Sequence, residues 1–203
     1  MNIQFWLLRP HLIVPRLRFW FFERSNSDKP WLCAGTIAFL NQALNREMVG
    51  VEFGSGRSTR WLAARLKTLV SVEQNSEWYQ IVTDQLKQAG IQNVDYRMIP
   101  TEHPESEPER EVYVPIPSYV AVLNEFEDNS IDFVLVDGHY RSTCIKAAVS
   151  KIRPGGYLVV DDTNMWNVIG GLPAPLEWVC VDTSTNGIKT AKIWQKPGDR
   201  GSC

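Results

Sequence analysis

The sequence has few of the features that mark metal-binding, disulfide-rich or membrane-spanning proteins. Its 203 residues include only 4 cysteines, Cys33, Cys144, Cys180 and Cys203, and no two are spaced as C-x-x-C. This spacing argues against a zinc site and a disulfide framework, so we expect free thiols in a reducing cytoplasm. The net charge is only -2, so we expect no nucleic-acid partner. No apolar run reaches the ~20 residues that a transmembrane helix needs.

The first 27 residues form an extension to a domain that we predict over residues 28–203. Residues 1–24 are apolar and aromatic, are interrupted by Pro10 and Pro15, and carry four arginines against one glutamate. A segment of this kind can lie on a membrane surface. It can also cover the domain or form a homodimer contact, because large apolar patches generally mark interfaces. We therefore expect a cytoplasmic protein, with peripheral membrane association as one alternative.

Strand-like and helix-like segments alternate along the remaining chain. Apolar strands are predicted at 48–53, 69–73, 94–99, 131–137 and 157–162, with helices starting at Asp28, at Ser58 or Thr59, at Asn75, near Ser118 and near Ser142. A turn is expected at the RPGG segment before the fifth strand, and Asn186-Gly187 predicts a hairpin between two final apolar runs. Such alternation predicts an α/β fold with a mostly parallel sheet and helices on both faces.

The segment VEFGSGRSTRWLA joins the first strand to a helix through two glycines and indicates a nucleotide-binding loop. A dinucleotide fingerprint would require a third glycine where Thr59 stands. Glu52, next to the loop, suits a ligand with positive charge rather than a pyrophosphate. Glu73 ends the second strand, where a carboxylate can accept hydrogen bonds from ribose hydroxyls. These residues favour S-adenosylmethionine over NAD, although an NAD-type oxidoreductase stays an alternative.

Three segments resemble the class I S-adenosylmethionine-dependent methyltransferases: VEFGSGRST, SVEQNSEWY and DFVLVDGHYRSTCIKAAVSKIRPGGYLVVDD. The sequence is most similar to the small O-methyltransferase-like group, over roughly residues 30–194. The resemblance implies a Rossmann-like, seven-stranded sheet that ends in an antiparallel hairpin. It also implies a set of cofactor-binding residues: Glu52, Gly54, Ser55, Gly56, Ser58, Thr59, Glu73, Gln74 and Asp137.

Two further strand ends carry candidate catalytic residues. Asp137 and His139 follow the fourth strand, and Asp161 and Asp162 follow the fifth. Three carboxylates at one sheet edge suit Mg²⁺ or another divalent cation, and the resemblance to metal-dependent O-methyltransferases makes Asp137, Asp161 and Asp162 its ligands. Alternatively, these carboxylates only bind backbone N–H groups of the loops. His139 is the candidate general base.

The sequence therefore predicts an enzyme that transfers a methyl group from S-adenosylmethionine to a small-molecule acceptor, at a hydroxyl oxygen. Besides the oxidoreductase, one alternative is a non-catalytic module that binds the cofactor and docks on a membrane or a partner.

Overall fold

The computed structural model of the chain describes residues 13–26, 28–104, 107, 109–110, 113–164 and 174–198. Its centre is a seven-stranded sheet with the strand order β3-β2-β1-β4-β5-β7-β6. The strands are β1 (Val49–Phe53), β2 (Thr68–Glu73), β3 (Val94–Met98), β4 (Ile131–Val136), β5 (Ile152–Val160), β6 (Val179–Thr185) and β7 (Thr190–Gln195). The first five strands are parallel to one another, and β7 is antiparallel to both β5 and β6. The predicted fold class is confirmed.

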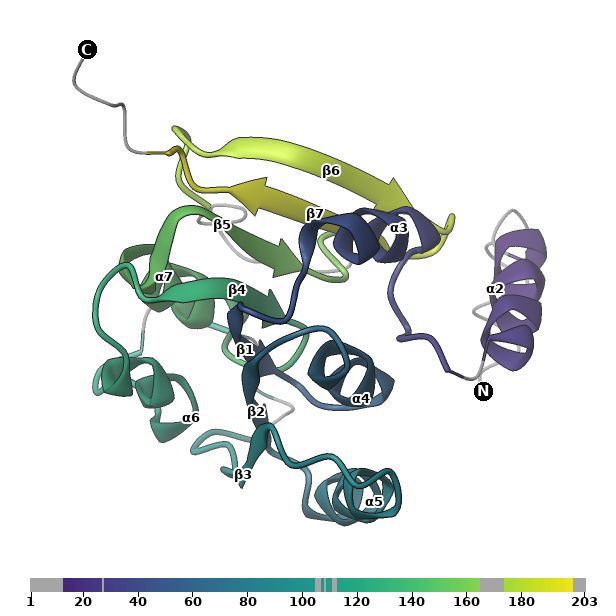
Figure 1. The fold of residues 1–203 in the computed structure, drawn as a ribbon, viewed down its shortest axis with the longest axis horizontal. Coiled ribbons are helices and arrows are strands. Elements are labelled where there is room, and N and C mark those ends of the chain that lie inside the picture. Colours follow the sequence, from purple (N-terminus) through teal and green to yellow (C-terminus); the bar gives the residue numbers. More distant parts are fainter. Residues whose placement is uncertain are drawn as a thin grey trace.

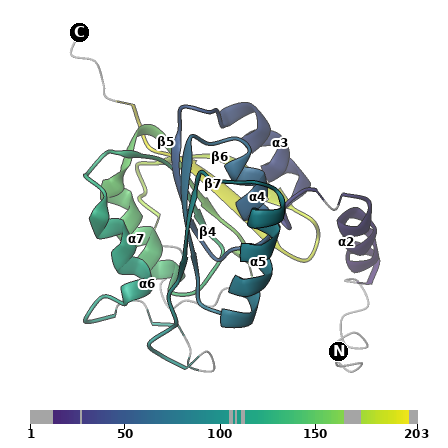
Figure 2. The same ribbon diagram turned by 60° about the horizontal axis from the view of Figure 1, so that its bottom comes forward.

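Helices cover both faces of this sheet (Figures 1 and 2). The helices of the described chain are α2 (Ile13–Ser25), α3 (Ala34–Ala43), α4 (Arg57–Ala63), α5 (Ser76–Gln88), α6 (Ser118–Ala121), the 3-10 helix η2 (Val122–Glu125) and α7 (Arg141–Lys151), of which α2 stands apart from the sheet (Figures 1 and 2). Figure 2 shows α3, α4 and α5 on one face and α6 and α7 on the other. The fold is thus a three-layer α/β arrangement, with ligand-binding positions expected at the carboxyl ends of the parallel strands.

The middle strand β4 shows why the sequence folds in this way. All six of its residues are buried, as expected for a central parallel strand covered on both faces. Successive side chains point to opposite faces. Phe133 and Leu135 join the core beneath α3 and α4, whereas Val134 and Val136 join the core beneath α7. One strand, apolar except for Asp132, therefore serves two hydrophobic cores.

The predicted start of the first domain helix was wrong. We expected a helix from Asp28, but the helix begins at Ala34, and residues 28–33 are turn and bend. Pro30 disfavours helical backbone at the preceding residue, and tertiary contacts hold the segment. Trp31 stacks on Trp78 with ring centroids 6.0 Å apart, and Leu32 is buried in the core. Packing therefore overrides the local helix signal.

The RPGG segment also differs from the expected turn. It lies inside β5, where the pairing with β4 shifts register between Ile131 and Phe133. Gly155 has a φ of 79°, which a residue with a side chain rarely adopts. The glycine therefore permits an irregularity within the strand instead of a turn before it.

The amino-terminal helix α2 lies at the periphery of the molecule (Figures 1 and 2). It exposes several large apolar side chains, namely Ile13, Val14, Leu17, Trp20 and Phe21. No helix in the described parts of the chain is long and apolar enough to cross a bilayer. Residues 1–12 lie outside the described residues. Peripheral membrane or homodimer contact through residues 1–24, and the domain boundary at residue 28, stay predictions.

Candidate functional site

The loops after β1 and β4 meet at two glycines. Gly54 has a φ of 89°, and a Cβ placed on it would lie 2.7 Å from the backbone nitrogen of Gly138. A Cβ on Gly138 would lie 2.2 Å from the Tyr119 hydroxyl oxygen and 2.9 Å from the Gly54 nitrogen. Real Cβ atoms do not approach that closely, so a side chain at either position would separate the loops. The two glycines therefore bring the loop that follows Gly54 alongside Asp137.

The Glu73 carboxylate, at the end of β2, fastens the glycine loop. Its Oε2 accepts hydrogen bonds from the Ser55 backbone nitrogen at 3.0 Å and from the Ser55 hydroxyl at 2.6 Å. Its Oε1 accepts from the backbone nitrogens of Gln74 and Asn75 at 3.0 and 2.9 Å. Asn75 then caps α5 by accepting from the Trp78 nitrogen at 2.9 Å, as predicted from the sequence. One carboxylate thus organises both loops around it.

Glu52 and Thr59 lie beneath the glycine loop. Glu52 is fully buried, and its Oε2 accepts from the hydroxyls of Thr59 at 2.7 Å and Ser71 at 2.6 Å. The Thr59 hydroxyl also accepts from the Gly56 nitrogen at 2.9 Å. Burial raises the pKa of Glu52 to about 7, against the hydroxyl groups of Ser58, Ser71 and Thr59, which lower it. Through these hydrogen bonds, Glu52 and Thr59 support the glycine loop from the protein interior.

A cavity of about 410 Å³ opens in front of these loops. Five of the predicted cofactor residues line it: Gly54, Ser55, Glu73, Gln74 and Asp137. The other four, Glu52, Gly56, Ser58 and Thr59, are not among the lining residues. Gln74 brings a buried side-chain oxygen, Oε1, that has no hydrogen-bond partner among the described residues. Gln74 thus lines the cavity and has an amide oxygen that no described residue uses.

Sequence reasoning missed the cavity wall formed by α5, which includes Trp78 and Ile81. The Trp78 indole nitrogen donates to the Ser55 carbonyl at 2.9 Å, and its ring stacks on Trp31. The apolar residues of α5 recur at helical spacing, a pattern that is typical of a face packed on the core. A usable signal was the position of Trp78 in the first turn after Glu73, because that turn faces the strand mouths.

The three aspartates at the mouths of β4 and β5 do come together, as predicted. One carboxylate oxygen from each of Asp137, Asp161 and Asp162 lies within 4.8 Å of the others. Two cations of the chain already hold them. Lys189 Nζ lies 2.6 Å from Asp161 Oδ2 and 3.8 Å from Asp162 Oδ1. Arg141 Nη2 lies 3.3 Å from Asp137 Oδ1 and 3.8 Å from Asp162 Oδ2.

This arrangement does not fit the predicted divalent cation. Although Asp161 Oδ1 and Asp162 Oδ1 accept no hydrogen bond within the described residues, the three carboxylates face two positive side chains at ion-pair distance. A divalent cation needs several oxygen ligands in its shell, and Lys189 occupies the Asp161 oxygen that would supply one. The protein therefore completes this cluster with its own cations.

Burial and close charged neighbours shift the pKa values of the aspartates and of Lys189. Burial and the neighbouring Asp161 raise the pKa of Asp137 to about 7, although Arg141 and Lys189 lower it. Burial also raises the pKa of Asp161, and Lys189 opposes that change. Burial alone would lower the pKa of Lys189, but Asp161 and its neighbours raise it above its ordinary value. The aspartates thus hold Lys189 in its charged form, and Lys189 in turn limits the rise in the pKa of Asp161.

The two candidate catalytic residues lie on different cavities. Asp137 lines the large cavity, whereas His139 lines a small one of about 30 Å³ with Tyr113, Tyr140 and Glu109. Tyr140 holds the segment at residues 102–103 against this small cavity, because its hydroxyl accepts hydrogen bonds from the backbone nitrogens of Glu102 and His103 at 2.9 and 3.2 Å. His139 therefore lies toward the segment that precedes α6, away from the cavity lined by Glu73 and Gln74.

A family model described as a methyltransferase domain matches residues 51–163 of the chain, from β1 to just beyond β5. The chain belongs to this methyltransferase family. The match covers the glycine loop, Glu73, Asp137 and the aspartates after β5. It makes this chain an enzyme of that class and favours methyl transfer over the oxidoreductase alternative.

Solved structures share the methyltransferase fold at low sequence identity. The yhhF protein from Escherichia coli superposes with a TM-score of 0.59 and 11% identity, over 81% of this chain and 85% of that one. An S-adenosylmethionine-dependent methyltransferase from Aquifex aeolicus gives 0.51 and 13%, over 84% and 95%. An RNA methyltransferase from Salinibacter ruber, solved with S-adenosyl-L-homocysteine, gives 0.50 and 16%, over 82% and 93%. A comparison with curated proteins gave no match.

Proposed function

We propose that this methyltransferase binds S-adenosylmethionine in the 410 Å³ cavity and methylates a hydroxyl oxygen of a small molecule. The observation that carries the proposal is the composition of the cavity wall, which joins Gly54, Glu73, Gln74 and Asp137 at the carboxyl ends of β1, β2 and β4. Ligands of open α/β sheets bind at these strand ends.

The cavity residues divide into groups that suit different parts of the cofactor. We assign the ribose to the cavity wall at Glu73, whose carboxylate also accepts hydrogen bonds from Ser55, Gln74 and Asn75. The side-chain amide of Gln74 on the same wall is assigned to an amino group such as that of adenine. The glycine at position 54 leaves backbone atoms open to close approach. When bound, S-adenosylmethionine supplies an electrophilic methyl group on a positively charged sulfur.

Asp137 is the residue that we assign to the acceptor. It lies on the cavity wall beside Gly54 and Gly138, and its side chain is 27% exposed. There it can accept a hydrogen bond from the acceptor hydroxyl and then its proton, which makes the oxygen a better nucleophile. Arg141 stays close enough to hold the Asp137 carboxylate in place, at 3.3 Å. In this proposal Asp137 acts as the general base, and His139 lies on the neighbouring cavity.

The test pairs binding with turnover. Wild type, Asp137→Asn and the control Asp84→Asn, which alters an exposed carboxylate on α5, are titrated with S-adenosylhomocysteine by calorimetry. Each is then assayed against a panel of small hydroxyl compounds and against total RNA. We expect Asp137→Asn to keep its affinity but lose roughly 10²–10⁴-fold in kcat, the usual contribution of a general base. The control should match wild type in both measurements.

Three outcomes would count against the proposal. Wild-type turnover by Asp137→Asn would remove its assignment as base. Failure of the wild type to bind S-adenosylhomocysteine would remove the cofactor assignment. Methylation of RNA alone, which the name of the Salinibacter neighbour makes worth testing, would replace the small-molecule acceptor.

A further inference from the structure

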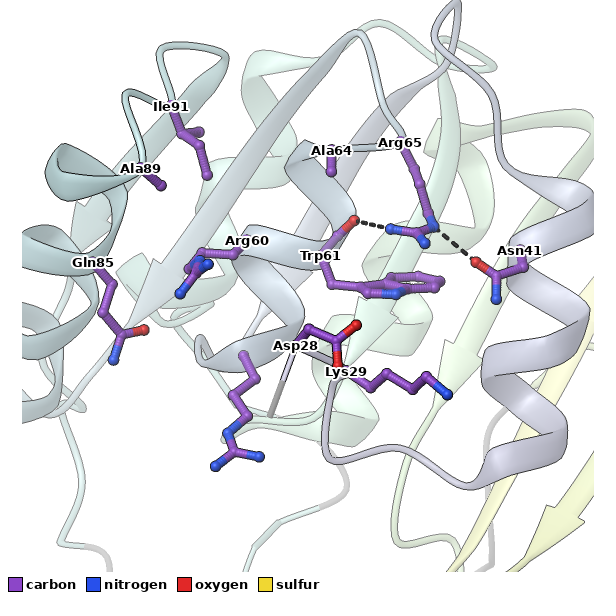
Figure 3. Close-up of a pocket in the computed structure, with 11 residues that line it drawn as sticks. Asp28, Lys29, Asn41, Arg60, Trp61, Ala64, Arg65, Gln85, Ala89 and Ile91 are labelled. Atoms are coloured by element: carbon purple, nitrogen blue, oxygen red, sulfur yellow. Dashed lines mark hydrogen bonds between the residues drawn. The ribbon is translucent and has the colours of Figure 1, made fainter. Parts of the chain in front are cut away.

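A second cavity, of about 320 Å³, lies on the face of the sheet covered by α3, α4 and α5 (Figure 3). Its wall carries four basic side chains, Lys29, Arg57, Arg60 and Arg65, and a single carboxylate, Asp28. None of its lining residues belongs to the cavity that we assign to the cofactor. Positive charge is concentrated here although the whole chain has a net charge of -2.

Arg65 is fixed in place on this wall. Its Nε donates to Asn41 Oδ1 and its Nη1 to the Trp61 carbonyl, both at 2.9 Å, as Figure 3 shows. Its guanidinium lies 3.7 Å from the centre of the Trp61 ring. Its third nitrogen, Nη2, donates to none of the residues that the structure describes. Arg65 therefore presents a free, pre-oriented N–H edge, which saves ordering entropy when a ligand binds.

Two other cations of this wall have no anionic partner in the described part of the chain. Neither Arg60 nor Lys29 forms an ion pair or a side-chain hydrogen bond within the described residues, although Lys29 lies 5.9 Å from the Phe22 ring. Arg60 is exposed and projects from α4 into the space between Trp61 and Gln85 (Figure 3). Asp28 is the only carboxylate on this wall. The cavity therefore holds uncompensated positive charge around an aromatic ring.

We infer that this cavity binds a phosphate group, either free phosphate or a phosphomonoester of a small molecule. Arginine forks match phosphate oxygens and bind them with paired, charge-assisted hydrogen bonds. The volume lies at the lower end of small-ligand sites. A nucleic-acid strand would need a basic stripe that follows its backbone, whereas here the cations gather around one hollow and the chain is slightly acidic. A small phosphorylated ligand fits these features better.

The inference does not depend on the proposed methyl transfer, because it rests on different residues. Trp31 nevertheless connects a residue of each cavity. Arg57 lies 5.0 Å from the Trp31 ring, Trp31 stacks on Trp78, and Trp78 lines the first cavity. A phosphate held by Arg57 would therefore lie close to the cofactor cavity without entering it.

The experiment titrates the full chain by calorimetry, at constant ionic strength, with sodium phosphate, with phenyl phosphate and with a short single-stranded RNA. The variants are Arg60→Ala, the double variant Arg60→Ala with Arg65→Ala, and the control Lys67→Ala, an exposed cation outside the cavity. We expect saturable binding of one phosphate ligand, weakened about tenfold or more in Arg60→Ala and further in the double variant, with no change in Lys67→Ala. Tighter binding of phenyl phosphate than of free phosphate would identify a phosphomonoester as the ligand, and the reverse would identify free phosphate.

Several results would overturn the inference. One is the absence of saturable binding of either small ligand at millimolar concentration. Another is equal weakening by Lys67→Ala, which would indicate a general charge effect. A third is RNA binding that exceeds both small ligands and depends on Arg60, which would make the cavity part of a nucleic-acid surface. Thermal melting of each variant identifies losses that come from unfolding.

Discussion

Removal of the Lys189 charge is the most direct test of the aspartate cluster. Asp161 is fully buried, and the Lys189 ammonium lies 2.6 Å from its Oδ2. We propose Lys189→Met, which keeps an apolar stem of similar length but removes the cation. Loss of one partner leaves a buried carboxylate uncompensated, and such losses cost roughly 3–5 kcal/mol. Arg141 stays near Asp137 and Asp162 but reaches no carboxylate oxygen of Asp161 at ion-pair distance among the described contacts.

The loss should depend on pH with a defined sign. Burial raises the pKa of Asp161 above its ordinary value, and Lys189 opposes this rise. Without Lys189 the folded-state pKa rises further. The folded variant then binds a proton more readily than the unfolded chain, so its stability falls as pH rises from the unfolded pKa to the folded one. We therefore expect a larger loss at pH 8 than at pH 5.5, where protonation of Asp161 relieves the unpaired charge.

Urea denaturation at pH 5.5 and pH 8 measures the free energy of unfolding of the wild type and of Lys189→Met. Lys192→Met is the matched control, because Lys192 lies in β7, three residues after Lys189 on the same hairpin, and forms no ion pair among the described residues. The double variant Asp161→Asn with Lys189→Met should recover most of the loss at pH 8. A Lys189→Met loss no larger than that of Lys192→Met would refute the ion-pair argument. A clear rise in wild-type melting temperature with Mg²⁺ would refute our conclusion that the protein's own cations complete the cluster.

Two further substitutions test the carboxylates that hold the glycine loop, Glu73 and Glu52. Glu73→Ala should weaken S-adenosylhomocysteine binding by about 1.5–3 kcal/mol, the usual value for hydrogen bonds to a charged group, and unchanged affinity by calorimetry would contradict the ribose assignment. Glu52→Gln tests the buried carboxylate, whose pKa is raised from 4.5 to about 7. Because the folded state favours the protonated form, wild-type stability falls between those pH values by about 3 kcal/mol. Glu52→Gln should lack this part of the fall in denaturation measured from pH 4.5 to pH 8.

Local sequence signals could predict the parts of the site in which the interacting residues lie close together in the sequence. The glycines, Glu73 at the end of its strand and Asn75 as a helix cap act within a few residues of one another, and Asn186-Gly187 makes its turn with Gly187 at a φ of 84°. The order of alternating strands and helices likewise predicted the sheet. These features need no knowledge of distant contacts.

The features that sequence reasoning missed depend on contacts between distant segments. Lys189 reaches Asp161 only because β7 pairs with β5, and nothing in the local sequence marks it as a counterion. Trp31 is held out of a helix by Trp78, so its neighbours do not continue the expected helical pattern. Glu52 appeared to be a ligand contact because it adjoins the loop. Its strand position instead turns it into the interior, toward Ser71.

Lys189 is synthesised after the three aspartates that it contacts, and this order affects how the nascent chain folds. The ribosome releases β1, β4 and the three aspartates before the hairpin that carries their main cation. Until β7 docks beside β5, Asp161 must stay protonated or hydrated, and that edge of the sheet cannot close around it. We expect nascent chains that end before β6 to remain open at this edge and sensitive to proteases. We therefore expect this edge to close only after the last hairpin has docked beside β5.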